Sequence, residues 1–97
     1  MTLTARKRRT VRLVDLPGRP GETMACDATS RTDALDLLIK GETVTTAGSN
    51  GAMNLWRAGG EWRAEFMRYM VRISCISTNK VSEVRAWLRE WWPKLGK

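Results

Sequence analysis

The sequence predicts an α+β domain in which an antiparallel sheet of three to five strands carries two helices on one face. Short segments of the second half alternate apolar and polar residues, as half-buried strands do. Two other segments place apolar residues at helical spacing between capping residues and stop signals. The chain has 97 residues, of which 42% are hydrophobic, enough for one core. We therefore expect a flexible basic arm over residues 1–9 and a single domain over residues 10–97.

The first half of the chain is expected to form two short strands and a helix. Residues 10–16 alternate as a strand, and residues 17–21, PGRPG, contain the proline and glycines typical of a turn. Residues 22–26 then return as a second strand. Residues 28–41 are expected to form a helix, because Thr and Ser residues at its start cap free N–H groups and Lys40-Gly41 ends it.

The second half reads as a meander of strands followed by a helix. Strands are expected at residues 42–47, 53–58, 61–67 and 71–75. The segment Arg68-Tyr69 either turns the chain or lies within one long bent strand, since it contains no glycine. The last helix is expected to begin near residues 77–79 and to end at Pro93.

The tryptophans are expected mainly to build the fold. Trp62 lies on the apolar face of its strand and Trp87 on the apolar stripe of the last helix, so both are assigned to the core. Trp91 and Trp92 are adjacent, and adjacent helical positions are about 100° apart. We therefore expect one of them to be exposed, as part of a protein interface or a base-stacking platform. The alternative is that this tryptophan packs under the N-terminal segment.

The sequence lacks the residues that several classes of catalytic and metal site require. The chain has no histidine, which excludes Ser-His-Asp and Cys-His arrangements and histidine metal sites. No P-loop or GxGxxG is present, so we predict no catalytic residues, metal or cofactor, although a lysine or carboxylate mechanism stays open. Asp33 and Asp36 are expected on a solvated helix face. Cys26 and Cys75 are expected to be buried free thiols, with a disulfide between them as the alternative.

Localisation follows from what the sequence lacks. No apolar run approaches the roughly 20 residues that span a membrane. The basic N-terminus is not followed by the apolar core of a signal peptide. We therefore expect a cytoplasmic protein with no membrane partner.

The charge distribution is the main functional signal. The net charge is +7, and residues 51–97 hold nine Lys/Arg against four Asp/Glu, a net of +5. Arginine binds phosphate and guanine edges bidentately. Arg57, Arg63 and Arg72 lie on separate expected strands, which would place them in one exposed patch about as wide as a DNA groove. The alternative is that they pair with Glu61 and Glu65 on a solvated sheet face.

The N-terminus adds a second basic element. Arg6, Lys7, Arg8 and Arg9 are consecutive. Such a run is typical of arms that bind nucleic acid and equally of solvated tails.

Residues 56–92 carry a family resemblance. The matching pieces are Gly60-Glu-Trp62-Arg-Ala64, then Arg72-Ile-Ser74, then Ser77-Thr78, then Ala86-Trp87-Leu88. They resemble the arm-type (APETALA2-like) DNA-binding domains at the N-termini of phage tyrosine integrases, which combine a three-stranded sheet with a helix.

The resemblance implies a site and a set of core residues. By it, the exposed sheet face enters the DNA major groove with Arg57, Arg63 and Arg72 as contacts. The implied core is Trp62, Phe66, Trp87 and Leu88. The sequence departs from the family where Met67 to Met70 replace the usual glycine-containing turn. No recombinase domain follows in the sequence, which implies a free-standing module.

These observations lead to two functional expectations and a third related one. The first is a small DNA-binding accessory or regulatory protein of a phage or other mobile element, which contacts DNA through an arginine-bearing sheet face. The alternative is a phage-encoded inhibitor, of the anti-CRISPR kind, that binds a host nucleic-acid-processing complex and blocks it sterically. Trp91, Trp92 and the arginines would then form a protein interface. An RNA-binding module would need exposed aromatic side chains for base stacking.

Overall fold

The computed structural model describes residues 11–17 and 21–97, so the expected basic arm, Arg6, Lys7, Arg8 and Arg9, lies outside the described residues. The described part contains one six-stranded sheet in the order β1-β2-β3-β4-β5-β6 and two α-helices. The strands are β1 (Val11–Asp15), β2 (Glu22–Cys26), β3 (Thr43–Gly48), β4 (Gly51–Ala58), β5 (Glu61–Arg68) and β6 (Val71–Thr78). The helices are α1 (Arg31–Ile39), α2 (Val81–Trp91) and the short 3-10 helix η1 (Trp92–Leu95).

The sheet is mixed, which corrects the expected antiparallel sheet of three to five strands. Neighbouring strands run antiparallel except β2 and β3, which pair in parallel through Ala25 opposite Thr43 and Cys26 opposite Val44. The cause is α1, which connects β2 to β3. A helix between two strands carries the chain back to the end where the first strand began, so the second strand runs in the same direction.

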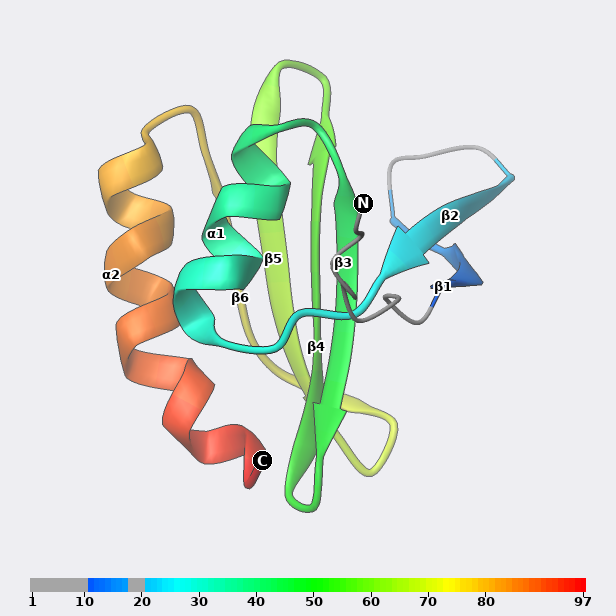
Figure 1. The fold of residues 1–97 in the computed structure, drawn as a ribbon, viewed down its shortest axis with the longest axis vertical. Coiled ribbons are helices and arrows are strands. Elements are labelled where there is room, and N and C mark those ends of the chain that lie inside the picture. Colours follow the sequence, from blue (N-terminus) through cyan, green and yellow to red (C-terminus); the bar gives the residue numbers. More distant parts are fainter. Residues whose placement is uncertain (1–10, 18–20) are drawn as a thin grey trace, which may run out of the picture.

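Both helices cover the same face of the sheet, as predicted (Figure 1). Between them and the sheet lies the main core, which includes Leu38 of α1, Val44 of β3, Phe66 of β5 and Leu88 of α2, all at most 1% exposed. The sheet residues of this core alternate along their strands with residues on the opposite side. We call that opposite side, away from the helices, the outer face.

The β1–β2 hairpin lies on the outer-face side of the sheet (Figure 1). Under it is a second, smaller core formed by Leu16, Trp56 and Ala58, with Val14 packed against them. The Trp56 Nε1–H donates to the backbone oxygen of Pro17 at 3.2 Å, so its polar atom is satisfied. The outer face is therefore covered near β4 by this hairpin.

The last turns of the chain correct the expectation for Trp91 and Trp92. Both side chains are half-buried and pack against the main core. The Trp91 ring lies 5.1 Å from that of Phe66, and Lys94 Nζ lies 4.2 Å from its centroid. The expected exposed tryptophan is absent from this pair because α2 ends at Trp91 and the chain tightens into η1, which brings Trp92 back to the core.

The two other tryptophans lie largely as predicted. Trp87 is 7% exposed, and its Nε1–H donates to Ser74 Oγ at 3.1 Å. Trp62 is half-buried and packs against the same core. These contacts join α2 to the helix-covered face of β5 and β6.

The cysteines divide between the two faces. Cys26 is buried in the main core, whereas Cys75 is exposed, and no disulfide joins them. The expectation of two buried thiols is wrong for Cys75. Its cross-strand partner is Glu65 on β5, which places it on the outer face.

The turn between β5 and β6 decides between the two expectations for this segment. Tyr69 and Met70 form a tight turn, with a register shift between Phe66 and Met67 just before it. Their φ angles are 52° and 67°, in the left-handed region that normally holds glycine or asparagine. The chain therefore turns here although it contains no glycine.

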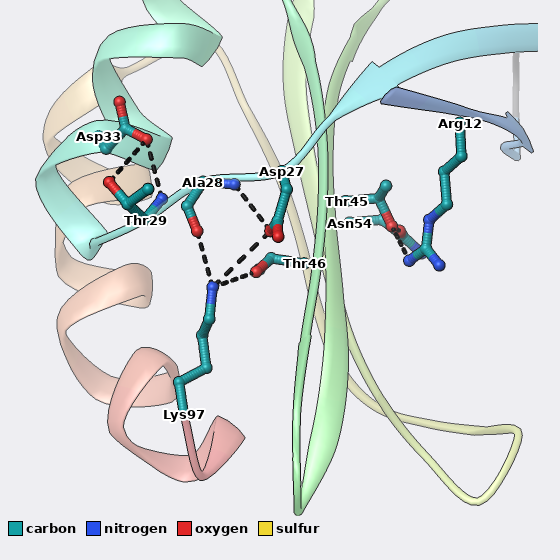
Figure 2. A network of polar contacts seen from close by, with 9 residues as sticks. All are labelled: Arg12, Asp27, Ala28, Thr29, Asp33, Thr45, Thr46, Asn54 and Lys97. Carbon is teal, nitrogen blue, oxygen red and sulfur yellow. Dashed lines mark hydrogen bonds and ion pairs between the residues drawn. The ribbon is translucent and has the colours of Figure 1, made fainter. Parts of the chain in front are cut away.

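The side chain of Lys97, which follows η1, is bound to the sheet and to the segment before α1 (Figure 2). Lys97 Nζ donates to the backbone oxygen of Ala28 and to Thr46 Oγ1, both at 2.7 Å, and lies 3.7 Å from Asp27 Oδ1. None of the helices in the described residues has the length and apolar character needed to cross a membrane.

Candidate nucleic-acid interface

A row of polar side chains crosses the outer face from one edge of the sheet to the other. It consists of Arg12, Thr45, Asn54, Glu65 and Arg72, from β1, β3, β4, β5 and β6. We call this row the polar ladder. Figure 2 shows its first three members on the side of the sheet away from the helices.

Each step of the polar ladder is a short contact. Arg12 Nη2 donates to Thr45 Oγ1 at 3.0 Å, and this hydroxyl donates to Asn54 Oδ1 at 2.7 Å. Asn54 Nδ2 donates to Glu65 Oε2 at 2.9 Å, and Arg72 Nε lies 3.2 Å from Glu65 Oε1. The buried carboxylate is thus held between an amide and a guanidinium, as a buried charge requires.

The sheet register produces this alignment. Thr45 lies directly opposite Asn54, and Asn54 directly opposite Glu65. Cross-strand partners on one face have closely spaced Cβ atoms, so short polar side chains reach one another. Arg72 joins the row after the register shift between Phe66 and Met67, which pairs it with Met67.

A pocket of about 250 Å³ lies beside the ladder on the outer face. We call it the outer pocket; its lining includes Pro17, Trp56, Arg63, Glu65, Arg72 and Ser77. The hairpin-covered Trp56 forms one of its walls, and β5 and β6 form others. The pocket therefore combines an aromatic surface with two guanidinium groups and a hydroxyl.

Arg63 is the least satisfied cation of this pocket. Its Nε is buried and has no hydrogen-bond partner among the described residues. Its Nη2 is 4.0 Å from Glu61 Oε1, a long ion pair, and that oxygen already accepts from Ser77 Oγ at 3.0 Å. Because solvent does not reach the Nε, an anion in the pocket would be bound by the terminal Nη groups of this side chain, which is 33% exposed.

The structure brings two of the three predicted arginines together and separates the third. Arg63 and Arg72 both line the outer pocket. Arg57 does not, because its cross-strand partner is Trp62, whereas Arg63 lies opposite Trp56. Arg57 therefore shares the helix-covered face with Trp62, where its guanidinium lies 4.7 Å from the ring centroid. The expectation of one patch with all three arginines is wrong for Arg57.

The pairing alternative is also visible on this face. Arg72 pairs with Glu65, and Arg63 pairs more loosely with Glu61. The two carboxylates thus offset part of the positive charge of the outer pocket. Arg63 keeps the larger unsatisfied donor capacity of the two arginines.

Two further groups of arginines were not singled out from the sequence. Arg68 stands beside the β5–β6 turn and donates from Nε to the backbone oxygen of Asn50 at 2.8 Å. A groove of about 290 Å³ between α1 and α2 is lined by Arg31, Arg85 and Arg89, with Asp36 as its carboxylate. The spacing of four residues between Arg85 and Arg89 places them on one side of α2 and was the available signal.

No group of three or more potential metal ligands occurs among residues 11–17 and 21–97. A scan against models of protein families finds no match, and neither do searches of curated proteins and of solved structures. The resemblance to arm-type integrase domains therefore stays a prediction.

Proposed function

We propose that the protein is a non-enzymatic DNA-binding protein that contacts phosphate groups through its outer face, centred on the outer pocket. The observation that carries the proposal is the pairing of Arg63 and Arg72 in one open pocket, where their side chains are 33% and 47% exposed. Phosphate oxygens suit such donors, because arginine binds them bidentately. The net charge of +7 attracts a polyanion to the whole molecule.

The width of the sheet favours backbone contacts over groove reading by the whole face. Six strands at about 4.8 Å spacing span about 24 Å, whereas the major groove is about 12 Å wide. A face of this width lies across phosphates rather than inside a groove. On this basis the outer face supplies affinity without sequence information.

By resemblance, the setting would be an accessory or regulatory role in a phage or other mobile element. The basic arm over residues 1–9 precedes β1, whose Arg12 already lies on the outer face. The sequence of this arm offers four further basic residues for phosphate contacts, Arg6, Lys7, Arg8 and Arg9.

The test is a titration of the purified protein against random duplex DNA at two salt concentrations. Binding through phosphates weakens steeply as salt rises. Arg63→Ala should lower the affinity and reduce the salt slope by about one. Arg57→Ala removes the same charge from the adjacent strand on the other face and should change both far less. Equal effects of the two variants, or no binding at low salt, would contradict the proposal.

A second candidate function is inhibition of a host protein complex. The observation that favours it is β6, an edge strand of the sheet with Val71 57% and Ile73 46% exposed. An exposed edge of this kind accepts a strand from another protein. Absence of DNA binding at low salt would favour this candidate.

A further inference from the structure

The tip of the β5–β6 hairpin exposes two large apolar side chains. Tyr69 and Met70 are 91% and 93% exposed. They occupy the turn itself, so no neighbouring strand or helix shields them. Adjacent exposed apolar side chains form a patch, and exposed apolar patches rimmed by polar residues mark contacts with other molecules.

The backbone at this tip is conformationally unfavourable for these residues. Both φ angles lie in the left-handed region, at 52° and 67°. Asn-Gly or Asp-Gly is the ordinary choice for a two-residue hairpin turn with this backbone. Tyr and Met therefore make the turn less stable than the ordinary sequence would, and strain of this kind is typical of functional positions.

The surroundings of the tip are cationic. Arg68 precedes the turn and Arg72 follows it, and no carboxylate occurs between Glu65 and Glu83. Both arginines are anchored through Nε, Arg68 to the backbone oxygen of Asn50 at 2.8 Å and Arg72 to Glu65 at 3.2 Å. The two guanidinium groups lie on opposite faces of the hairpin, Arg68 over the Phe66 ring at 5.5 Å and Arg72 at Glu65 on the outer face. The tip thus presents an apolar pair with one cation on each face, which fits a partner with an apolar interior and a polyanionic exterior.

The hairpin bends toward the outer-face side of the sheet at its tip (Figure 1). It therefore lies on the same side as the outer pocket. A hairpin tip is narrow enough to enter a DNA groove that the full sheet cannot, and β-ribbons enter the minor groove where apolar wedges open it. The tip therefore projects toward a duplex that lies across the outer face.

We propose that the β5–β6 hairpin enters the minor groove of DNA bound to the outer face, where Tyr69 and Met70 wedge between adjacent base pairs and kink the duplex. Apolar wedges of this type unstack a base step from the minor groove, while flanking arginines contact phosphates on either side. Base pairs supply the apolar interior for Tyr69 and Met70, and the backbone supplies the anions for Arg68 and Arg72. The inference rests on the proposed function.

The test uses the double variant Tyr69→Asn/Met70→Gly in the full chain. It keeps both flanking arginines and installs the residues that this turn prefers, so it should raise the melting temperature, which thermal unfolding checks. Ile39→Asn is the matched control, because it removes another exposed apolar side chain, 51% exposed at the end of α1. The probes are a duplex with 2-aminopurine at successive positions and a duplex with a fluorophore at each end.

The wild-type protein and Ile39→Asn should raise 2-aminopurine fluorescence severalfold and shorten the end-to-end distance. The double variant should lose both signals while the slope of affinity against salt stays unchanged, since no charge is removed. Binding by the wild type without either signal, or signals retained by the double variant, would overturn the wedge and leave the proposed function standing. A wild type that does not bind duplex DNA at low salt would overturn both.

One other partner shares this chemistry. A membrane with anionic headgroups would also receive an apolar tip between arginines. The wedge would be overturned by two results together. The wild-type protein would bind vesicles of phosphatidylcholine and phosphatidylserine while the double variant does not, and the wild-type protein would leave the 2-aminopurine fluorescence of the duplex unchanged.

Discussion

Replacement of Glu65 by glutamine should move stability and DNA affinity in opposite directions. Glu65 is 6% exposed and is held by Asn54 Nδ2 at 2.9 Å and Arg72 Nε at 3.2 Å. Glutamine preserves the size of the side chain. Its amide has only one oxygen, so its NH₂ group faces Asn54 Nδ2 or Arg72 Nε, both of which are donors, and that hydrogen bond is lost. Loss of a hydrogen bond to a charged group costs about 1.5–3 kcal/mol. Because the Arg72 side chain is 47% exposed and finds water instead, we expect about 1.5 kcal/mol.

The expected change in melting temperature follows from the size of the chain. For domains of 60–100 residues each kcal/mol shifts the melting temperature by about 4–8 °C, so Glu65→Gln should lower it by about 6–12 °C. Thermal unfolding followed by circular dichroism measures this shift.

The same substitution frees Arg72 and raises the net charge of the outer face by one. One additional phosphate contact increases affinity about eightfold near 0.1 M salt, because log K changes by about 0.9 per contact for each decade of salt. Fluorescence anisotropy of a labelled duplex measures the affinity. Glu90→Gln is the control, because it makes the same charge change on the exposed side of α2. Reduced or unchanged affinity of a folded Glu65→Gln protein would refute an outer-face interface.

Two further substitutions test the attachment of the last residues to the fold. Gly48→Ala would drive its methyl group into the backbone of Leu95, so we expect the free energy of unfolding in urea to fall by about 1–3 kcal/mol. Gly59→Ala, at a positive φ in open space, is the control and should lower the free energy of unfolding by only about 1 kcal/mol. A larger loss for Gly59→Ala would contradict the packing of η1 against the β3–β4 turn. Lys97→Met removes the Nζ that donates to Ala28 and keeps the apolar stem, and should cost about 2 kcal/mol by the same assay. Unchanged stability would show that this lysine does not hold the sheet and helix together.

The elements of this fold were predictable because their signals are local. Period-two alternation, the Ser30 cap before α1 and the glycine turns all depend on residues close in sequence. The cap expected near residues 77–79 is wrong, because α2 begins at Val81 after Lys80, without a side-chain cap. The core roles of Phe66 and Leu88 followed from the same periodicities. The parallel pairing of β2 with β3 depends instead on where α1 packs, which a local pattern does not encode.

The candidate site was predictable only in part, because it depends on register and on a distant hairpin. Within their own strands, Arg57 and Arg63 both occupy polar positions of the apolar–polar alternation, so the sequence does not distinguish their faces. Only the pairing of Trp56 with Arg63 reveals that Arg57 faces the helices. Trp56 belongs to the outer pocket because the loop after β1, far away in sequence, packs against it.

The turn at Tyr69 and Met70 illustrates the opposite limit. The absence of glycine argued against a tight turn, yet the chain makes one with both residues left-handed. Local propensity was overridden here by the pairing of β5 with β6 on either side of the turn. A position at which a local rule fails is where a functional constraint is expected.

The most direct test of the central claim is the side-chain Nε–H signal of Arg63 in nitrogen-15 NMR spectra recorded with and without duplex DNA. This group belongs to the guanidinium whose exposed Nη groups the account assigns to a phosphate oxygen, so its signal reports that contact. We predict that the Arg63 signal shifts and exchanges more slowly with water when DNA is added, while the Arg57 signal stays in place. A shift at Arg57 with none at Arg63, or no change in either signal at saturating DNA, would contradict the account.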